Sequence, residues 1–546
     1  MLLEETYLSY VDNGANLNAE AKEELKKINT ELSTLSLKFG ENVLKDSNAF
    51  ELFVDNETDL QGLPEDVKEA AKITAKSKGK ENSWCFTLDY PSYIPFMQYA
   101  ENRELRKKMF LAYGSRAFKN NDFNNENILQ KISELRLKKA KLLGFASHAE
   151  KTLKRRMAEN TEKVTKLLNE LVKFAKPIAK NEISEITELS KKLNGPEKLE
   201  RWDFSFYSEK LKKEKFDIDD EILKPYFQLE KVLEGVFLTA KKLYGIKFIE
   251  NTDIQKYHKD IVTYEVLDEN DRHLALFYAD FFPRKGKRNG AWMTSFKGQN
   301  KYDGIEQRPH VSIVCNFTKP TEKKPSLLTF NEVTTLFHEF GHSLHGIFAD
   351  GYYESLSGTS VFWDFVELPS QLMENWCYEK ECLDLFAIHY VTNEPIPIEL
   401  VQKIKDSANY LSAYQTVRQV SLGVLDMAWH DTKNTINESV GDFEKKVVEQ
   451  FDLLPKVEGV NTSCSFSHIF QGGYSAGYYS YKWAEVLEAD AFEYFKETGV
   501  FNKETARKFR ENILSKGGSA HPMTLYKNFR GKEPSAEALL RKSGLK

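Results

Sequence analysis

The sequence contains little cysteine for its length, only five in 546 residues, and it has no Cys-x-x-Cys pair. The number is odd and the spacing is irregular, which argues against both a disulfide framework and a thiolate metal site. We therefore expect all five cysteines to be reduced and buried, as free cysteines in protein cores usually are.

A large excess of one charge and a long apolar run are also missing. Lysine and arginine number 77 and aspartate and glutamate 82, a formal net charge of −5, which gives no positive field for nucleic acid. The apolar runs are far shorter than the roughly 20 residues that span a bilayer. Acidic Glu4 and Glu5 stand where a signal peptide would be basic. We expect a cytoplasmic protein that binds neither nucleic acid nor a membrane; the alternative is that a targeting segment lies outside this chain.

A helical repeat of apolar residues is the dominant pattern along the chain. Apolar residues recur every three or four positions in the first part of the chain, and similar patterns predict helices further on. These stretches are 20–45, 128–142, 161–174, 400–430, 441–453 and 478–498. Short β-branched or aromatic segments, which predict strands, are confined to the middle of the chain, at 261–266, 274–282 and 310–315. At this length two lobes are expected, and without a Gly/Ser-rich linker they should be interleaved.

The most specific motif is His-Glu-x-x-His at residues 338–342. Residues four apart on a helix lie about 40° from each other around its axis, so both imidazoles can reach one ion. Glu339 lies beside the first imidazole and can contact water at that ion. His345 is about 10 Å further along the axis and is interpreted as a packed structural histidine.

A catalytic zinc site also needs a third protein ligand and an open position. Glu367 follows His342 by 25 residues, enough for a helix end, a loop and the start of another helix. Asp364, one helical turn before Glu367, and Glu374, two turns after it, are both candidates to hold a ligand imidazole. The residues alone leave that choice open.

A second group of candidate residues lies at 466–481. Glycines at 472, 473 and 477 allow close approach of the backbone to a ligand, and His468 and four tyrosines crowd into the same segment. Such groups suit hydrogen bonding to a developing oxyanion in acyl chemistry. The alternative is an aromatic core that faces a helix.

These motifs together resemble the thimet oligopeptidase-like family of zinc peptidases, which includes oligopeptidase A and the bacterial peptidyl-dipeptidases. The resemblance rests on Phe-His-Glu-Phe-Gly-His at 337–342, Ser-Gly-Thr at 357–359, Asp-Phe-Val-Glu-Leu-Pro-Ser-Gln at 364–371, the 468–481 segment, and Ile-Leu-Ser-Lys-Gly-Gly-Ser at 513–519. It covers essentially the whole chain, although the usual N-terminal helical segment of the family is lacking.

The resemblance implies a mostly α, two-lobed, zincin-like fold with a small β-sheet near the active site and a deep central channel. We expect a helical lobe at 1–215, a zinc-binding lobe with the sheet at 216–410, and a helical segment at 411–546. That last segment should return to the first lobe and close the active site. The protein is expected to be a monomer.

The resemblance also assigns roles to individual residues. One zinc ion per chain is expected, held by His338, His342 and Glu367, with Glu339 as the general base.

The remaining candidate residues are expected to face the substrate. Tyr481 is the expected oxyanion donor, helped by His468, while Tyr474 and Tyr478 are expected to bind the oligopeptide.

Two activities compete within the family. The segments 277–282, 290–293 and 344–349 resemble peptidyl-dipeptidases, which release C-terminal dipeptides, whereas residues 467–546 equally resemble oligopeptidase A, which cuts within short peptides. We expect the peptidyl-dipeptidase activity, with the oligopeptidase as the alternative. Such an enzyme must read the substrate's terminal carboxylate, for which Tyr474, Lys482 and Arg418 are candidates. An inactive peptide-binding protein is disfavoured, because Glu339 and all three ligands are present.

Overall fold

The helices expected from apolar periodicity are present in the computed structural model, which describes residues 2–546. The first three are α2 (Ala19–Ala49), α6 (Glu126–Leu142) and α8 (Thr161–Lys192). Asn160 caps α8 by accepting a hydrogen bond from the backbone N–H of Lys163 at 2.9 Å. The predicted stretch 400–430 is divided into α16 (Ile398–Asp406) and α17 (Ser412–His430), because Leu411 adopts a left-handed φ of +58° between them.

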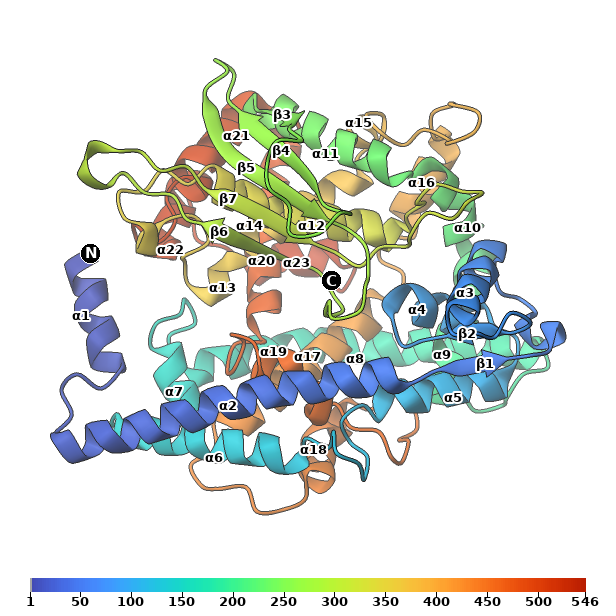
Figure 1. The fold of residues 1–546 in the computed structure, drawn as a ribbon, viewed down its shortest axis with the longest axis horizontal. Coiled ribbons are helices and arrows are strands. Elements are labelled where there is room, and N and C mark those ends of the chain that lie inside the picture. Colours follow the sequence, from blue (N-terminus) through green and yellow to red (C-terminus); the bar gives the residue numbers. More distant parts are fainter. Residues whose placement is uncertain (1) are drawn as a thin grey trace.

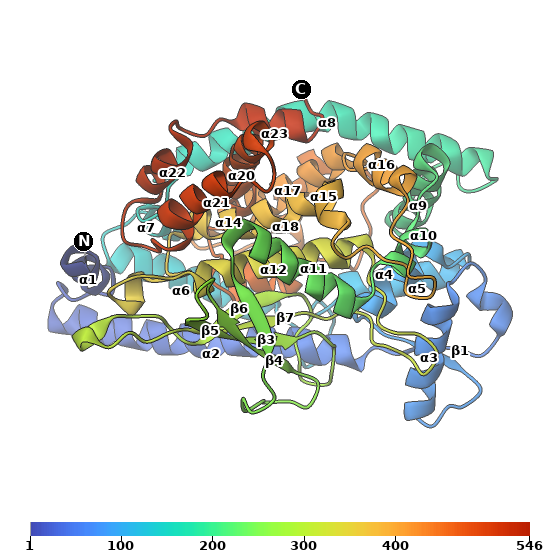
Figure 2. The same ribbon diagram turned by 90° about the horizontal axis from the view of Figure 1, so that it is seen from above.

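The helices are arranged in two lobes (Figure 1). The lower lobe contains α2, α6, α8 and α17, with α8 and α2 along opposite sides when seen from above (Figure 2). Its other helices are α3 (Glu65–Ser77), α4 (Tyr90–Tyr99), α5 (Arg103–Gly114), α7 (His148–Leu153), α9 (Arg201–Phe216), α18 (Val440–Val448) and α19 (Ser467–Phe470). The helix α1 (Leu2–Asp12) stands beside the space between the lobes in Figure 1.

The upper lobe is built around a five-stranded sheet. Its strand order is β3-β4-β5-β7-β6, with β5 and β7 parallel and the other neighbours antiparallel. The strands are β3 (Lys247–Glu250), β4 (Val262–Leu267), β5 (His273–Asp280), β6 (Trp292–Lys297) and β7 (His310–Val314). The three predicted strands correspond to β4, β5 and β7. The pattern missed β3 and β6, which lie at the sheet edges and are mostly exposed or half-buried.

Strands are not confined to the middle of the chain, so that prediction was wrong. Two three-residue strands, β1 (Leu52–Val54) and β2 (Trp84–Phe86), pair in the lower lobe. Each is too short to show a readable alternation of apolar and polar residues.

The remaining helices of the upper lobe pack with the sheet into one core. They include α11 (Leu229–Tyr244), α12 (Phe330–Ile347), α13 (Trp363–Val366), α14 (Leu368–Glu374), α20 (Ser480–Thr498), α21 (Lys503–Phe509) and α22 (Pro522–Arg530). The helix α16 and the short α10 (Asp220–Leu223) and α15 (Lys380–Leu383) complete this lobe (Figure 1). The last helix, α23 (Ala536–Lys542), packs instead into a core with α8 and α17. The three-part division of the chain at 215 and 410 stays a prediction.

All five cysteines are free and buried, as expected. No helix formed by residues 2–546 combines the length and apolarity needed to cross a membrane.

Candidate active site

The His-Glu-x-x-His motif lies on α12, directly after the sheet. Thr329 and Glu332 form a reciprocal capping box, each side chain accepting a hydrogen bond from the backbone N–H of the other, which fixes where the helix begins. Phe337, Phe340 and Leu344 are buried in the core shared with the sheet. The helical period therefore directs His338 and His342 to another face of α12, where both imidazoles are partly exposed.

Gly341 allows the second part of the site to approach this face. A Cβ atom at this position would lie 2.3 Å from the carbonyl oxygen of Pro369 and 2.6 Å from Cα of Ser370. Only a glycine permits this contact between α12 and α14. Glu367, at the junction of α13 and α14, is thereby placed against the two imidazoles.

The three candidate ligand atoms form a compact group. Oε2 of Glu367 lies 3.2 Å from Nε2 of His338 and 3.2 Å from Nε2 of His342. Ligand atoms about 2.0–2.1 Å from one tetrahedral zinc ion lie about 3.3 Å from one another. The spacing and the two-His, one-Glu donor set therefore fit a catalytic zinc site, and no other such group is found among residues 2–546. Because the imidazoles are partly exposed, one side of the group stays open to a substrate.

Neighbouring side chains hold the candidate ligands in place. Nδ1 of His338 lies 2.7 Å from Oε1 of Glu374, so Glu374 rather than Asp364 is the acceptor for this imidazole. The Ser370 hydroxyl donates to Oε2 of Glu367 at 2.9 Å, and the Tyr474 hydroxyl donates to Oε1 at 2.5 Å. Burial alone would raise the pKa of Glu367, because it disfavours the charged carboxylate. The two imidazoles outweigh this effect and hold the pKa well below its usual range.

Asp364 has a different role, the anchoring of α13 to the lower lobe. Its buried carboxylate accepts hydrogen bonds from the backbone N–H groups of Met157 and Ala158 at 3.0 and 2.9 Å. It also accepts one from the Tyr479 hydroxyl at 2.8 Å. Asp364 therefore joins the helix before Glu367 to two segments of the other lobe.

Glu339 is buried, with 4% of its surface exposed. Its Oε2 atom has no hydrogen-bond partner within the described chain. Burial raises the pKa of this carboxyl group, while the nearby imidazoles partly oppose the change. A buried carboxylate oxygen with no partner among the described residues, one position along the chain from His338 and three from His342, suits the role of a proton acceptor.

The aromatic residues of 466–481 gather beside the ligands. The rings of Tyr474 and Tyr481 are stacked with centroids 5.1 Å apart, and Tyr478 lies 5.2 Å from Tyr481. His468 lies 5.7 Å from Tyr478 and 6.3 Å from Tyr481. All four predicted residues are thus brought together, and the hydrogen bond from Tyr474 to Glu367 connects them to the ligands.

The ionisation of this group suits hydrogen bonding to an anion. Burial, followed by the negative charge of Glu367, raises the pKa of Tyr481 well above its ordinary value, so its hydroxyl keeps its proton. Burial lowers the pKa of His468, which favours the neutral ring.

Two residues of the site, Ser370 and Gln371, stand in the 364–371 motif but were given no role in the prediction. Ser370 donates to Glu367, and the side chain of Gln371 donates to the carbonyl oxygen of Tyr481 at 3.1 Å. His345 is fully buried and lies outside the ligand group, as expected of a packed histidine; burial lowers its pKa to about 3.

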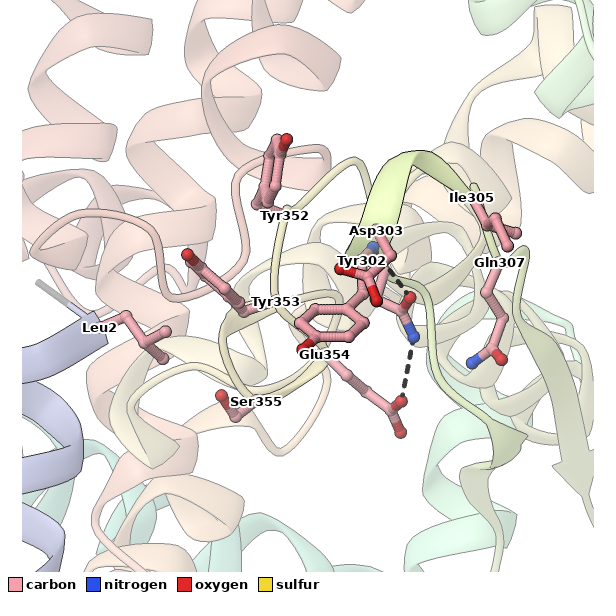
Figure 3. Close-up of a pocket in the computed structure, with 10 residues that line it drawn as sticks. Leu2, Tyr302, Asp303, Ile305, Gln307, Tyr352, Tyr353, Glu354 and Ser355 are labelled. Atoms are coloured by element: carbon pink, nitrogen blue, oxygen red, sulfur yellow. Dashed lines mark hydrogen bonds between the residues drawn. The ribbon is translucent and has the colours of Figure 1, made fainter.

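Two cavities lie outside the ligand group. One, of about 560 Å³, separates α3 and α4 from the start of α12, where Asn331 and Thr334 line it one to two turns before His338. The other, of about 660 Å³, is lined by Leu2, Tyr302, Tyr352, Tyr353, Glu354 and neighbouring residues (Figure 3). None of the predicted site residues lines this second cavity, so it is separate from the candidate site.

The sequence is similar to known peptidases over nearly its whole length. It is 41% identical over 540 residues to oligopeptidase A of Haemophilus influenzae, covering 98% of this chain and 79% of that protein. It is 39% identical over 548 residues to dipeptidyl carboxypeptidase of Escherichia coli, covering 100% of this chain and 80% of that protein.

Solved structures show the same fold at lower sequence identity. PZ peptidase A in complex with an inhibitor matches with a TM-score of 0.56 at 17% identity, covering 96% of this chain and 76% of that one. Oligoendopeptidase F from Enterococcus faecium matches with a TM-score of 0.52 at 15% identity, covering 100% and 76%. The profile of peptidase family M3 matches residues 96–545. This chain therefore belongs to peptidase family M3 and is a metallopeptidase with a mostly helical, zincin-like fold.

Proposed function

We propose that this protein hydrolyses oligopeptides with one zinc ion held by His338, His342 and Glu367. The observation that carries the proposal is the pair of 3.2 Å separations from Oε2 of Glu367 to the two Nε2 atoms. A zinc ion bound there would polarise the scissile carbonyl group and lower the pKa of water toward 7.

Glu339 is the proposed general base. Its unpartnered Oε2 takes a proton from the attacking water and passes it to the nitrogen of the leaving amine. The buried position of Glu339 keeps bulk water from competing for that oxygen.

The aromatic group is proposed to act on the other side of the scissile bond. The Tyr481 hydroxyl donates to the oxyanion that develops on the carbonyl carbon, with His468 as a second donor. Tyr478 and Tyr474 line the path of the peptide, and Tyr474 also holds Glu367. One donor of this kind is worth about 10²–10³ in rate.

We further propose that the enzyme releases C-terminal dipeptides, with Arg418 as the group that reads the terminal carboxylate. Of the three candidates, Lys482 is buried and pairs with Glu485 at 2.6 Å, and Tyr474 is bound to Glu367. Arg418 is exposed and has no ion pair within residues 2–546. It lies one turn before Leu422 on α17, and Leu422 packs against the core that includes Tyr478.

The alternative is cleavage within short peptides. Oligopeptidase A relatives at 41% identity favour it, beside the dipeptidyl carboxypeptidase relatives at 39% and 38%. Mass spectrometry of the products from a free-acid peptide and from its C-terminal amide separates the two activities. Binding a neutral C-terminal amide in a pocket built for a carboxylate leaves hydrogen-bond donors unpaired, which costs roughly 2–5 kcal/mol. If the enzyme releases dipeptides, the amidated peptide should therefore be cut at least about 30-fold more slowly than the free acid. Equal rates would support the oligopeptidase.

Arg418→Gln tests the assigned residue in the same assay. The preference for the free acid should disappear in this variant and persist in a control, Arg507→Gln, which removes an exposed arginine from α21. A preserved preference in Arg418→Gln would place the carboxylate pocket elsewhere. A cytoplasmic location and a monomeric state remain predictions.

A further inference from the structure

One buried carboxylate binds three consecutive backbone N–H groups of the tyrosine-bearing segment. Asp426, on α17, accepts hydrogen bonds from the N–H groups of Ala476, Gly477 and Tyr478, each at 2.8 Å. Asp426 is fully buried, and it is 50 residues away in sequence from the first of these donors. The contact therefore belongs to the tertiary structure and ties α17 to the turn that precedes α20.

The Asp426 carboxylate is also hydrogen-bonded to buried His430, which in turn contacts buried Arg136. Nδ1 of His430 lies 2.7 Å from Oδ1 of Asp426, and Nε2 of His430 lies 2.7 Å from Nη1 of Arg136. An arginine can only donate, so Nε2 is the acceptor and the proton of a neutral ring is on Nδ1, facing Asp426. Arg136 also donates to the carbonyl oxygen of Ile469 at 2.7 Å, at the other end of the same segment.

The neutral ring and charged guanidinium agree with their surroundings. Burial lowers the pKa of His430. Burial also lowers the pKa of Arg136 to about 10, which leaves it charged at neutral pH. The hydrogen bonds therefore run in one direction, from Arg136 through His430 to Asp426, and the carboxylate accepts four in total.

The turn that Asp426 binds is held in an unfavourable backbone conformation. Ala476 has a φ of +50°, in the left-handed region that a residue with a Cβ atom rarely adopts. Strain of this kind persists only where surrounding contacts fix it, and here the fixing contact includes the hydrogen bond from Ala476 itself.

The turn sets the positions of the proposed substrate-facing hydroxyls. Tyr474 lies two residues before the turn, Tyr478 is its last residue, and Tyr481 follows in the first turn of α20. On the far side of the turn the Tyr479 hydroxyl donates to buried Asp364, which is three residues before Glu367. Residues 476–479 are therefore hydrogen-bonded to two buried carboxylates. One is Asp426 on α17, and the other is Asp364 on α13, which precedes the proposed ligand Glu367.

We propose that Asp426 is a positioning residue. It fixes the 476–478 turn, so that the hydroxyl groups of Tyr478 and Tyr481 are already oriented toward the substrate before it binds. The proposal rests on the proposed function for its catalytic consequence, whereas the order that Asp426 imposes on the turn is independent of that function. His430 and Arg136 orient the carboxylate in turn. None of the three residues is proposed to touch the peptide.

Asp426→Asn is the direct test, because the side chain keeps its size but loses one acceptor oxygen. Whichever way the amide is turned, its NH₂ group faces two of the four donors. Asp203→Asn is the matched control, since Asp203 is also fully buried on α9 and binds Arg103 and Arg106 instead of the turn.

Hydrogen exchange gives a readout that needs no catalysis. In Asp426→Asn the amides of residues 476–478 should exchange at least tenfold faster than in wild type, and in Asp203→Asn they should be unchanged. Equal protection of these amides in Asp426→Asn and wild type would overturn the proposal even if the wild-type protein proved inactive.

Kinetics of the zinc-loaded protein tests the catalytic part. Asp426→Asn should lower kcat at least tenfold with KM changed less than about threefold, while Asp203→Asn should leave both close to wild type. In a Tyr481→Phe background the added loss from Asp426→Asn should fall below about threefold, because both changes remove the same hydrogen bond. An equally large loss in both backgrounds would show that Asp426 does not act through Tyr481.

A second pair of variants, at His430, tests the proposal even if Asp426→Asn folds poorly. His430→Asn keeps an N–H donor near the position of Nδ1, so its kcat should stay within about threefold of wild type. His430→Leu removes that donor and should lower kcat at least tenfold. Equal kcat values in these two variants would contradict the proposal.

Discussion

Nδ1 of His338 and Oε1 of Glu374 lie 2.7 Å apart. With the imidazole proton on Nδ1, the lone pair of Nε2 is available to a zinc ion that Oε2 of Glu367, 3.2 Å away, would also bind. A carboxylate in this position also raises the basicity of a ligand imidazole and fixes its orientation.

Glu374→Ala should therefore weaken zinc binding by about 10- to 100-fold without removing a ligand. The dissociation constant is measured by competition with a chelator. Glu381→Ala, an exposed glutamate on α15, is the control and should bind zinc as wild type does. An unchanged dissociation constant in Glu374→Ala would mean that this contact does not support the site.

The two stacked tyrosines should differ in what their hydroxyls do. Tyr474→Phe removes the hydrogen bond to Glu367 and should weaken zinc binding about tenfold or more. Tyr481→Phe should retain zinc but lower kcat by about 10²-fold with little change in KM, because its hydrogen bond strengthens only as charge develops. Zinc titration and steady-state kinetics of both variants check this. A change confined to KM in Tyr481→Phe would place its hydroxyl in ground-state binding.

Glu209, on α9, should make stability depend on pH. Burial raises its pKa from 4.5 to about 7, and Oε1 has no hydrogen-bond partner within the described chain. The folded protein thus prefers the protonated carboxyl, and stability is lost as pH rises from 4.5 through 7. The loss is about 3 kcal/mol by pH 8.

Glu209→Gln should abolish this loss. Its free energy of unfolding should exceed that of wild type at pH 8, and the difference should shrink toward pH 5. Denaturant unfolding at both pH values measures it, with exposed Glu214→Gln on the same helix as the control. A wild-type stability that is flat between pH 5 and 8 would refute the prediction.

The metal motif was predictable because its information is local. Residues 338 and 342 share a helix, and the helical period alone brings their imidazoles together. Whether Asp364 or Glu374 binds the His338 imidazole was not predictable, because residues 363–374 do not form one continuous helix. Glu367 separates α13 from α14, so counting helical turns across it fails.

The supporting contacts depend on the tertiary structure. Arg136 and His430 are 294 positions apart, and Asp364 binds backbone groups more than 200 residues earlier. No spacing rule links such residues before the fold is known. The contribution of Gly341 likewise becomes visible only when α14 is in place.

Turnover of Glu339→Gln at measured zinc content is the sharpest test of whether Glu339 is the base beside a zinc ion on His338, His342 and Glu367. The amide cannot accept the proton of the attacking water, and it leaves the three proposed ligands in place. Glu339→Gln should bind one zinc ion per chain, as wild type does, and its kcat should fall to well below a tenth of the wild-type value. A kcat of a tenth or more of the wild-type value at full zinc content would contradict this role for Glu339.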